Sequence, residues 1–116
     1  MNFLKSVLGG GDSGARQMNA AEARERISSS EPLYILDVRE TEEFRAGHLQ
    51  NAHLIPLNQL SKRITDLPKD QDILCVCASG SRSSMAARML AGAGYKVINL
   101  RGGMFAWQSA GYPIKR

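Results

Sequence analysis

Short apolar runs of strand length recur along the chain, each bounded by turn residues and separated from the next run by a longer segment with helical spacing. The runs are rich in aliphatic side chains and carry little charge, which is typical of strands buried on both faces of a parallel sheet. They predict four strands, at residues 34–38, 53–55, 73–77 and 96–100.

The segments between the runs predict helices. Asn19 followed by Glu22 resembles a capping box and starts a helix over 20–27. A short helix over 40–46 ends at Gly47. The last helix covers 104–110 and is followed by Gly111.

Two further helices are predicted from apolar spacing. We expect Asn58 to cap the first, which Pro68 ends; its inner face would hold Leu60, Ile64 and Leu67. The second covers 82–91 and stops at Gly92 and Gly94. Its apolar stripe would consist of Ala86, Met89, Leu90 and Ala93.

The N-terminal residues look separate from the rest. Phe3, Leu4, Val7 and Leu8 would share one face of a short helix, and the glycine-rich stretch 9–14 that follows is typical of a flexible linker. We therefore assign 1–16 to an N-terminal extension with a linker and 17–116 to a single domain. The extension is either a frayed tail or a docking helix.

Strands that alternate with helices across short connections predict an α/β fold with a parallel sheet covered on both faces. In such sheets, ligands bind beyond the carboxyl ends of the strands. The stretch Cys77 to Ser83 lies at one of these ends, between a predicted strand and a predicted helix.

Composition and charge narrow the possible functions. The 116 residues suffice for one domain, and 43% hydrophobic with 22% charged residues is ordinary for a soluble protein. No apolar stretch approaches the length that spans a bilayer or forms a secretory signal, so we expect a cytoplasmic chain with reduced thiols. The net charge of +4 comes from scattered Lys and Arg residues, which argues against a nucleic-acid surface.

The stretch from Cys77 to Arg82 combines several features of an anion site. It leaves a buried strand and enters a helix N-terminus, where unpaired N–H groups and the helix dipole favour negative charge. Small residues allow the backbone to curl around the thiol, and this environment lowers a cysteine pKa. Arg82 adds a permanent positive charge. The pattern predicts that Cys77 is a thiolate nucleophile rather than a core residue.

Cys75 and the two histidines receive different interpretations. Cys75 lies inside the apolar run, which predicts core packing, and extended geometry opposes a disulfide with Cys77. A zinc site is disfavoured because the two cysteines are closer together than usual ligand pairs and His48 and His53 belong to another unit. We expect His48 to form hydrogen bonds in a loop and Trp107 to pack in the core.

Four stretches, in this order, resemble the signatures of one family. The loop Cys77 to Arg82 resembles the active-site loop of single-domain rhodaneses, which are sulfurtransferases. The other three are Asp37-Val38-Arg39-Glu40 with Glu43-Phe44 and Gly47-His48-Leu49, then Ile55-Pro56-Leu57, and finally residues 100–107. The resemblance extends over about residues 18 to 115.

The resemblance implies a five-stranded parallel sheet with helices on both faces and a ping-pong reaction through a Cys77 persulfide, without a metal or organic cofactor. The donor would be thiosulfate, a persulfide or a polysulfide, and the acceptor cyanide or a thiol of a small molecule or protein. The N–H groups of the loop would hold the persulfide and the substrate, with Arg82 as the charged member; the loop consists of Ala78, Ser79, Gly80, Ser81, Arg82 and Ser83.

The resemblance also assigns Asp37 and Arg39 a supporting role, as an ion pair near the loop. This pair could act either as a plain salt bridge that holds the loop or as a direct contact to the substrate, and the sequence leaves both roles open. Some members that use thiosulfate carry basic residues where Ala78 and Ser79 stand, so we expect modest affinity for that dianion and consider persulfides, polysulfides or a protein partner as donors.

Two other functions are weighed against sulfur transfer. Phosphatases that share this fold place five residues between cysteine and arginine, whereas four intervene between Cys77 and Arg82, so the smaller cradle favours sulfur over phosphate. A non-enzymatic sulfur carrier or a redox-sensing interaction module is the second alternative, because a reactive thiolate also serves those roles.

Overall fold

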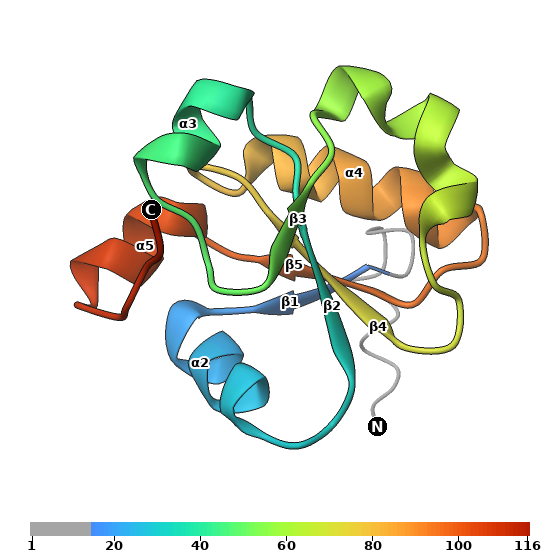
Figure 1. Ribbon diagram of the computed structural model, residues 1–116. Helices are drawn as coiled ribbons and strands as arrows, with labels where there is room; N and C mark the ends of the chain where they lie inside the picture. Colours follow the sequence, from blue (N-terminus) through green and yellow to red (C-terminus); the bar gives the residue numbers. More distant parts are fainter. Residues whose placement is uncertain (1–14) are drawn as a thin grey trace.

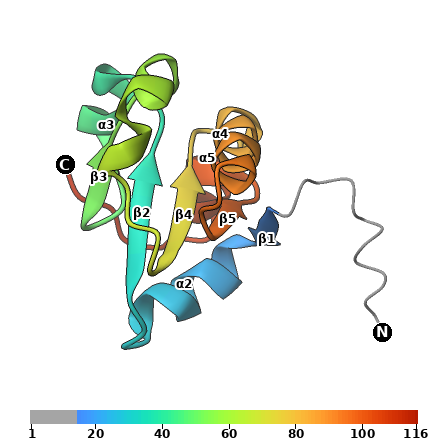
Figure 2. The same cartoon turned by 90° about the vertical axis from the view of Figure 1, so that its right-hand side faces the viewer.

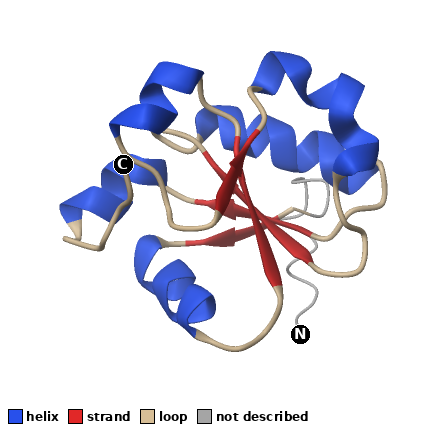
Figure 3. Cartoon of the chain, viewed as in Figure 1, coloured by secondary structure: helices blue, strands red, loops and turns tan. Residues whose placement is uncertain are grey.

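A parallel sheet of five strands forms the centre of the molecule in the computed structural model, which describes residues 15–116. The strand order is β1-β5-β4-β2-β3, and all four pairings are parallel. Figure 1 follows the chain through the sheet, and Figure 3 shows the strands surrounded by helices. The predicted α/β fold with a five-stranded parallel sheet and helices on both faces is confirmed.

The elements alternate as the apolar pattern predicts. The strands are β1 (Arg16–Met18), β2 (Leu33–Asp37), β3 (Ala52–Leu54), β4 (Asp72–Val76) and β5 (Val97–Leu100). The helices are α2 (Ala20–Ser28), α3 (Thr41–Ala46), the 3₁₀ helix η2 (Leu57–Asp66), α4 (Ser81–Gly92) and α5 (Gly103–Ser109).

Two apolar layers hold the sheet between its helices. One layer contains Leu60 of η2 and the α4 residues Ala86 and Leu90, packed against one face. The other contains Ala23 of α2 and Trp107 of α5, packed against the opposite face. Successive side chains of a strand point to opposite faces of the sheet, and both faces are covered, so every position along a strand favours an apolar residue. In β4, the residues from Ile73 to Val76 are all buried.

The helix ends are fixed by local chemistry. Asn19 and Glu22 form the predicted capping box at the start of α2, with reciprocal hydrogen bonds of 2.8 and 2.9 Å. A second capping box joins Glu40 and Glu43 at the start of α3. Figure 2 shows α3 at the end of the sheet toward which β2 and β4 point, so its side chains can reach the carboxyl ends of these strands.

Two details of the predicted helices are wrong. The segment after β3 is a 3₁₀ helix that begins after Pro56, with Asn58 inside it rather than at its cap. On α4, Met89 is 40% exposed and Ala93 lies beyond the helix, so neither belongs to the inner stripe. The buried α4 residues are instead Ser83, Ala86, Ala87 and Leu90, and a polar side chain thus occupies the inner face near the helix start.

The sequence pattern did not reveal β1. This three-residue strand pairs with β5 at the edge of the sheet and begins at Arg16, while Ala15 before it is buried in the core. The apolar positions Phe3, Leu4, Val7 and Leu8 lie outside the described residues. Within residues 15–116, no helix is both long and apolar enough to cross a membrane.

Candidate active site

Cys77 is the first residue after β4, the central strand of the sheet. The chain turns over Ala78 and Ser79 and enters α4 through Gly80, whose φ of 103° lies in the left-handed region that glycine adopts without strain. This turn places Cys77 under the N-terminus of α4, as the sequence predicted. Its side chain is fully buried.

Two main-chain N–H groups point at the Cys77 sulfur. The Gly80 N–H donates to Sγ over 3.1 Å, and the Ser83 N–H donates over 3.3 Å. Burial by itself raises the pKa of the Cys77 thiol, but hydrogen bonds from Ser83, Gly80 and Ser79 outweigh burial and lower this pKa below its ordinary value. The geometry therefore favours a thiolate held by N–H groups.

The start of α5 holds the other side of the loop. The Met104 N–H donates to the Cys77 carbonyl over 2.9 Å, and the Phe105 N–H donates to the Ala78 carbonyl over 3.0 Å. Gly103 makes this approach possible, because a Cβ there would collide with the carbonyl of Cys77 and the backbone of Ala78. The start of α5 thus packs directly on the loop backbone, and the carbonyls of Cys77 and Ala78 are bonded to α5.

Buried polar side chains lie beneath the loop. The Ser83 hydroxyl donates to Asn99 Oδ1 over 2.5 Å, and Asn99 Nδ2 donates to the Gly80 carbonyl over 3.4 Å and to Gln17 Oε1 over 3.0 Å. These contacts join the loop to β5 and through it to β1. They satisfy polar groups that would be costly to bury alone.

Arg82 is paired with an acid from a different helix. Its two terminal nitrogens donate to the two carboxylate oxygens of Glu43 on α3, over 2.8 and 2.9 Å. The hydrogen bonds from Arg82 lower the pKa of Glu43 from 4.5 to about 2, and they raise the already high pKa of Arg82. The positive charge predicted beside Cys77 is therefore present but largely balanced by Glu43.

Asp37 and Arg39 form the predicted ion pair. Asp37 is fully buried at the end of β2, and Arg39 Nη2 lies 2.8 Å from its carboxylate. A second bond of 2.7 Å runs from Arg39 Nη2 to the carbonyl of Gly47, which ends α3. The pair thus fixes the end of α3, the helix that carries Glu43, to the carboxyl end of β2.

The remaining candidate residues lie as expected. Cys75 is fully buried within β4, and burial raises its pKa to about 12. His48 Nδ1 contacts the Phe44 carbonyl at 2.8 Å, and its ring stacks on Phe44. Trp107 is buried and its Nε1 donates to the Pro113 carbonyl over 2.9 Å. Among the described residues, no three His, Cys, Asp or Glu side chains form a group that could hold a metal ion.

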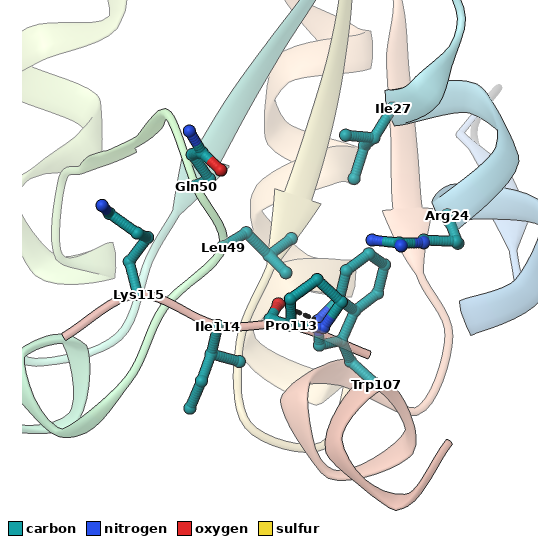
Figure 4. Close-up of a pocket in the computed structure, with 8 residues that line it drawn as sticks. All are labelled: Arg24, Ile27, Leu49, Gln50, Trp107, Pro113, Ile114 and Lys115. Atoms are coloured by element: carbon teal, nitrogen blue, oxygen red, sulfur yellow. Dashed lines mark hydrogen bonds between the residues drawn. The ribbon is translucent and has the colours of Figure 1, made fainter. Parts of the chain in front are cut away.

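A small cavity of about 90 Å³ lies away from Cys77, between α2, α5 and the C-terminal segment. Figure 4 shows its lining, in which Trp107, Leu49 and Ile27 form apolar walls and Arg24 reaches across. The indole nitrogen at its wall is already bonded to Pro113. The cavity therefore lies on the α2 and α5 side of the sheet, and no residue of the Cys77 loop lines it.

Sequence reasoning assigned no role to two residues of this site. Glu43 was noted only as part of the stretch Glu43-Phe44 that resembles the family, and its partner Arg82 lies 39 positions away in the sequence. Asn99 is the single polar residue of β5, with Val97, Ile98 and Leu100 around it. A lone polar side chain in a buried apolar run was the available signal for Asn99, because such a group needs hydrogen-bond partners.

The comparisons with known proteins agree with this geometry. A family model described as the rhodanese-like domain matches residues 19–110. A protein of Allochromatium vinosum named "Sulfurtransferase" is 33% identical over 99 residues, which are 84% of this chain and 92% of that protein. YtwF of Bacillus subtilis is 34% identical over 98 residues, covering 84% of this chain and 95% of its own. The crystal structure of a rhodanese-related protein from Thermoplasma volcanium matches with a TM-score of 0.81 at 33% identity, covering 86% of this chain and 97% of that one.

Proposed function

The chain belongs to the rhodanese-like domain family, and on that premise we propose that it transfers sulfane sulfur through a persulfide on Cys77. The observation that carries this proposal is the pair of N–H groups, from Gly80 and Ser83, that point at the Cys77 sulfur. Such donors stabilise the thiolate before the reaction and the terminal sulfur anion after it.

The first half-reaction loads the cysteine. The Cys77 thiolate attacks the outer sulfur of the donor, a new bond forms between Sγ and that sulfur, and the bond to the rest of the donor breaks with its electron pair. With thiosulfate, sulfite leaves and the charge is conserved. The product is a cysteine persulfide anion, whose outer sulfur extends from the buried Sγ toward the loop N–H groups.

The second half-reaction regenerates the free Cys77 thiolate. A thiophilic acceptor such as cyanide or a thiolate attacks the outer sulfur, and the Cys77 thiolate leaves with the electron pair of the S–S bond. Thiocyanate or a new persulfide is the product. No group other than Cys77 changes its covalent state in this cycle, so the proposed reaction uses no cofactor.

The preferred donor is a persulfide or polysulfide rather than thiosulfate. Ala78 and Ser79 carry no charge, and both terminal nitrogens of Arg82 are bonded to Glu43. A thiosulfate dianion would therefore meet a cradle of N–H dipoles whose own arginine is already neutralised. An organic persulfide or polysulfide, with a single charge on its terminal sulfur, loses less solvation on entering this cradle.

The test is the intact mass of the protein after incubation with thiosulfate or polysulfide, before and after addition of cyanide. We expect the mass of one sulfur atom to be gained and then removed by cyanide, with no gain in Cys77→Ala. Cys75→Ala is the matched control and should still gain sulfur. Failure of the wild type to gain sulfur from either donor contradicts the proposal. A gain of the same nominal mass that neither cyanide nor thiols remove would be the two oxygen atoms of a sulfinic acid, and it would point instead to a redox-sensing thiol.

A phosphatase reaction is tested in the same preparation. The loop from Cys77 to Arg82 has four intervening residues, which makes a smaller cradle than a phosphate requires. We expect no hydrolysis of an aryl phosphate. Hydrolysis that disappears in Cys77→Ser would replace sulfur transfer by phosphoryl transfer as the function of this site.

A further inference from the structure

Asn99 places an amide side chain in the apolar interior of the sheet. It lies on β5 beside β4, is 3% exposed, and is flanked by Ile98 and Leu100, which are fully buried. Burying an amide without partners costs about 1–3 kcal/mol in proteins, so its position calls for compensating hydrogen bonds. Three such bonds are present, and two of them lead to the Cys77 loop.

The two loop contacts of Asn99 end on the same residues that hold the Cys77 sulfur. Its Oδ1 accepts from the Ser83 hydroxyl over 2.5 Å, and its Nδ2 donates to the Gly80 carbonyl over 3.4 Å. Gly80 and Ser83 are also the residues whose N–H groups donate to Sγ. One side chain thus holds both ends of the turn that forms the sulfur cradle.

We propose that Asn99 is a positioning residue for Cys77, which acts by holding Gly80 and Ser83 so that their N–H groups converge on Sγ. The inference rests on the proposed function only for its consequence in catalysis. The arrangement itself concerns the thiolate, and a thiolate can be measured without any sulfur donor.

The Ser83 hydroxyl shows how the positioning works. It donates to Asn99 Oδ1 over 2.5 Å, so the bond to β5 sets the direction of the Ser83 side chain. The Ser83 side chain and the Ser83 N–H both help to lower the pKa of Cys77. Both contributions depend on the position of the first turn of α4, which the bond from Ser83 to β5 fixes.

Gln17 completes the arrangement from the sheet edge. Its Oε1 accepts from Asn99 Nδ2 over 3.0 Å, and it lies on β1, which pairs with β5. An amide bonded through its oxygen to Ser83 and through its nitrogen to Gln17 and Gly80 has its orientation specified. The edge strand is therefore linked to the cradle by a single intervening side chain.

Alkylation of Cys77 by iodoacetamide tests the proposal, with the rate followed across pH to give the thiol pKa. Asn99→Leu keeps most of the side-chain volume but removes all three bonds. We expect the Cys77 pKa to rise by about one unit, so that the rate near neutral pH falls several-fold. Arg82 and Glu43, the charged pair nearest the loop, are unchanged in this variant.

A matched control separates positioning from general loss of stability. Tyr95→Phe also removes a hydrogen bond, the partly buried bond of 2.6 Å from the Tyr95 hydroxyl to the Ile64 carbonyl of η2, and it leaves the loop unchanged. It should destabilise the fold and leave the Cys77 pKa unchanged. An unchanged or lowered pKa in folded Asn99→Leu overturns the proposal; a lowered value would mean that Asn99 withholds the Ser83 proton from the sulfur.

Gln17 provides a second variant if Asn99→Leu does not fold. Gln17 is exposed, so Gln17→Leu removes only the outer anchor of Asn99. We expect a rise of the Cys77 pKa that is smaller than the rise in Asn99→Leu. Equal pKa values in Gln17→Leu and wild type contradict the linkage. Because no sulfur donor is used, these outcomes are independent of whether the wild type gains sulfur from thiosulfate or polysulfide.

Discussion

Glu43 and Arg82 meet across the mouth of the Cys77 loop in a two-pronged ion pair. Both terminal nitrogens of the guanidinium donate to the carboxylate, over 2.8 and 2.9 Å, although the residues come from different helices. Both terminal nitrogens of Arg82 are therefore bonded to a carboxylate of the protein itself. The pair affects both the charge that a donor meets and the way α3 is attached to α4.

Glu43→Gln should improve the use of thiosulfate. The amide keeps the oxygen that caps the Glu40 N–H but no longer neutralises Arg82, so a dianionic donor gains a cation. We expect a several-fold lower KM for thiosulfate. Steady-state kinetics with cyanide as acceptor measure this change.

The control for that experiment is Glu42→Gln, which removes the same charge from an exposed neighbouring position on α3. It should leave KM near the wild-type value. Equal KM values for Glu43→Gln, Glu42→Gln and wild type would show that Arg82 takes no part in donor binding.

The same ion pair should appear in the acid dependence of stability. The folded pKa of Glu43 is lowered from 4.5 to about 2 by its hydrogen bonds with Arg82. A lowered folded pKa contributes stability above the unfolded value and loses it as pH falls through the folded value. Wild type should therefore exceed Glu43→Gln in unfolding free energy above pH 4.5, with the difference closing toward about pH 2. Urea unfolding at several pH values measures it, and a difference independent of pH would contradict the assignment.

The two cysteines should differ sharply in reactivity. Hydrogen bonds lower the pKa of Cys77 despite its burial, whereas burial raises that of Cys75 to about 12. Iodoacetamide near neutral pH should modify Cys77 alone, located by fragment mass spectrometry. Native Cys77→Ser should not react, and denaturant should make its Cys75 reactive. Comparable labelling of both cysteines in the native chain would argue against the selective cradle.

Gly103→Ala should disrupt the loop. Its φ of 56° disfavours a side chain, and a Cβ would overlap the Cys77 carbonyl. Strain and overlap together should cost on the order of 2–4 kcal/mol, with loss of sulfur loading. Gly92→Ala is the control, since its Cβ meets open space at the end of α4, and it should be neutral or stabilising by up to about 1 kcal/mol. Gly103→Ala with wild-type stability and loading would disprove the role of this approach.

Removal of Arg39 should be costly. Arg39→Met leaves the fully buried Asp37 carboxylate without its partner and frees the Gly47 carbonyl. Breaking a buried pair in this way costs about 3–5 kcal/mol. The exposed pair of Arg63 and Asp66 supplies a control, and Arg63→Met should cost less than about 1 kcal/mol. Thermal unfolding compares the variants, and similar losses in both would refute the distinction.

Four of the strands were predictable because a strand that is buried on both faces consists of consecutive apolar residues, which are visible in the sequence. A parallel strand such as β4 must be apolar at successive positions, so Ile73 to Val76 stand out from their neighbours. The strand β1 contains no such apolar run. Arg16 and Gln17 are exposed at the sheet edge, and pairing with β5 alone defines this short strand.

The helix η2 shows a different limit. Leu60 and Leu67 are buried as the spacing predicts, yet the segment winds as a 3₁₀ helix with a non-helical backbone at Arg63. Apolar positions three or four residues apart fit either winding, because both bring them to one side. Spacing identified the inner side of this segment and could not decide its type.

In the candidate site, too, the local part was predictable from the sequence and the long-range contacts were not. The turn from Cys77 to Ser83 is continuous in sequence, so its residue types predicted a thiol beneath a helix start. The contacts of Glu43 with Arg82 and of Asn99 with Ser83 join positions 39 and 16 residues apart. They exist because the sheet order brings β2 and β5 to either side of β4, a fact that no local pattern contains.

The central place of β4 has a consequence for how the protein loses activity. Strands β2 and β5 flank β4, and the loop that follows it is bonded to the first turn of α5. Edge elements such as β1 and β3 can fray and exchange their amide protons early, whereas β4 should exchange its amide protons only when the middle of the sheet separates. Thermal inactivation should therefore coincide with global unfolding, and amide exchange should be slowest along β4.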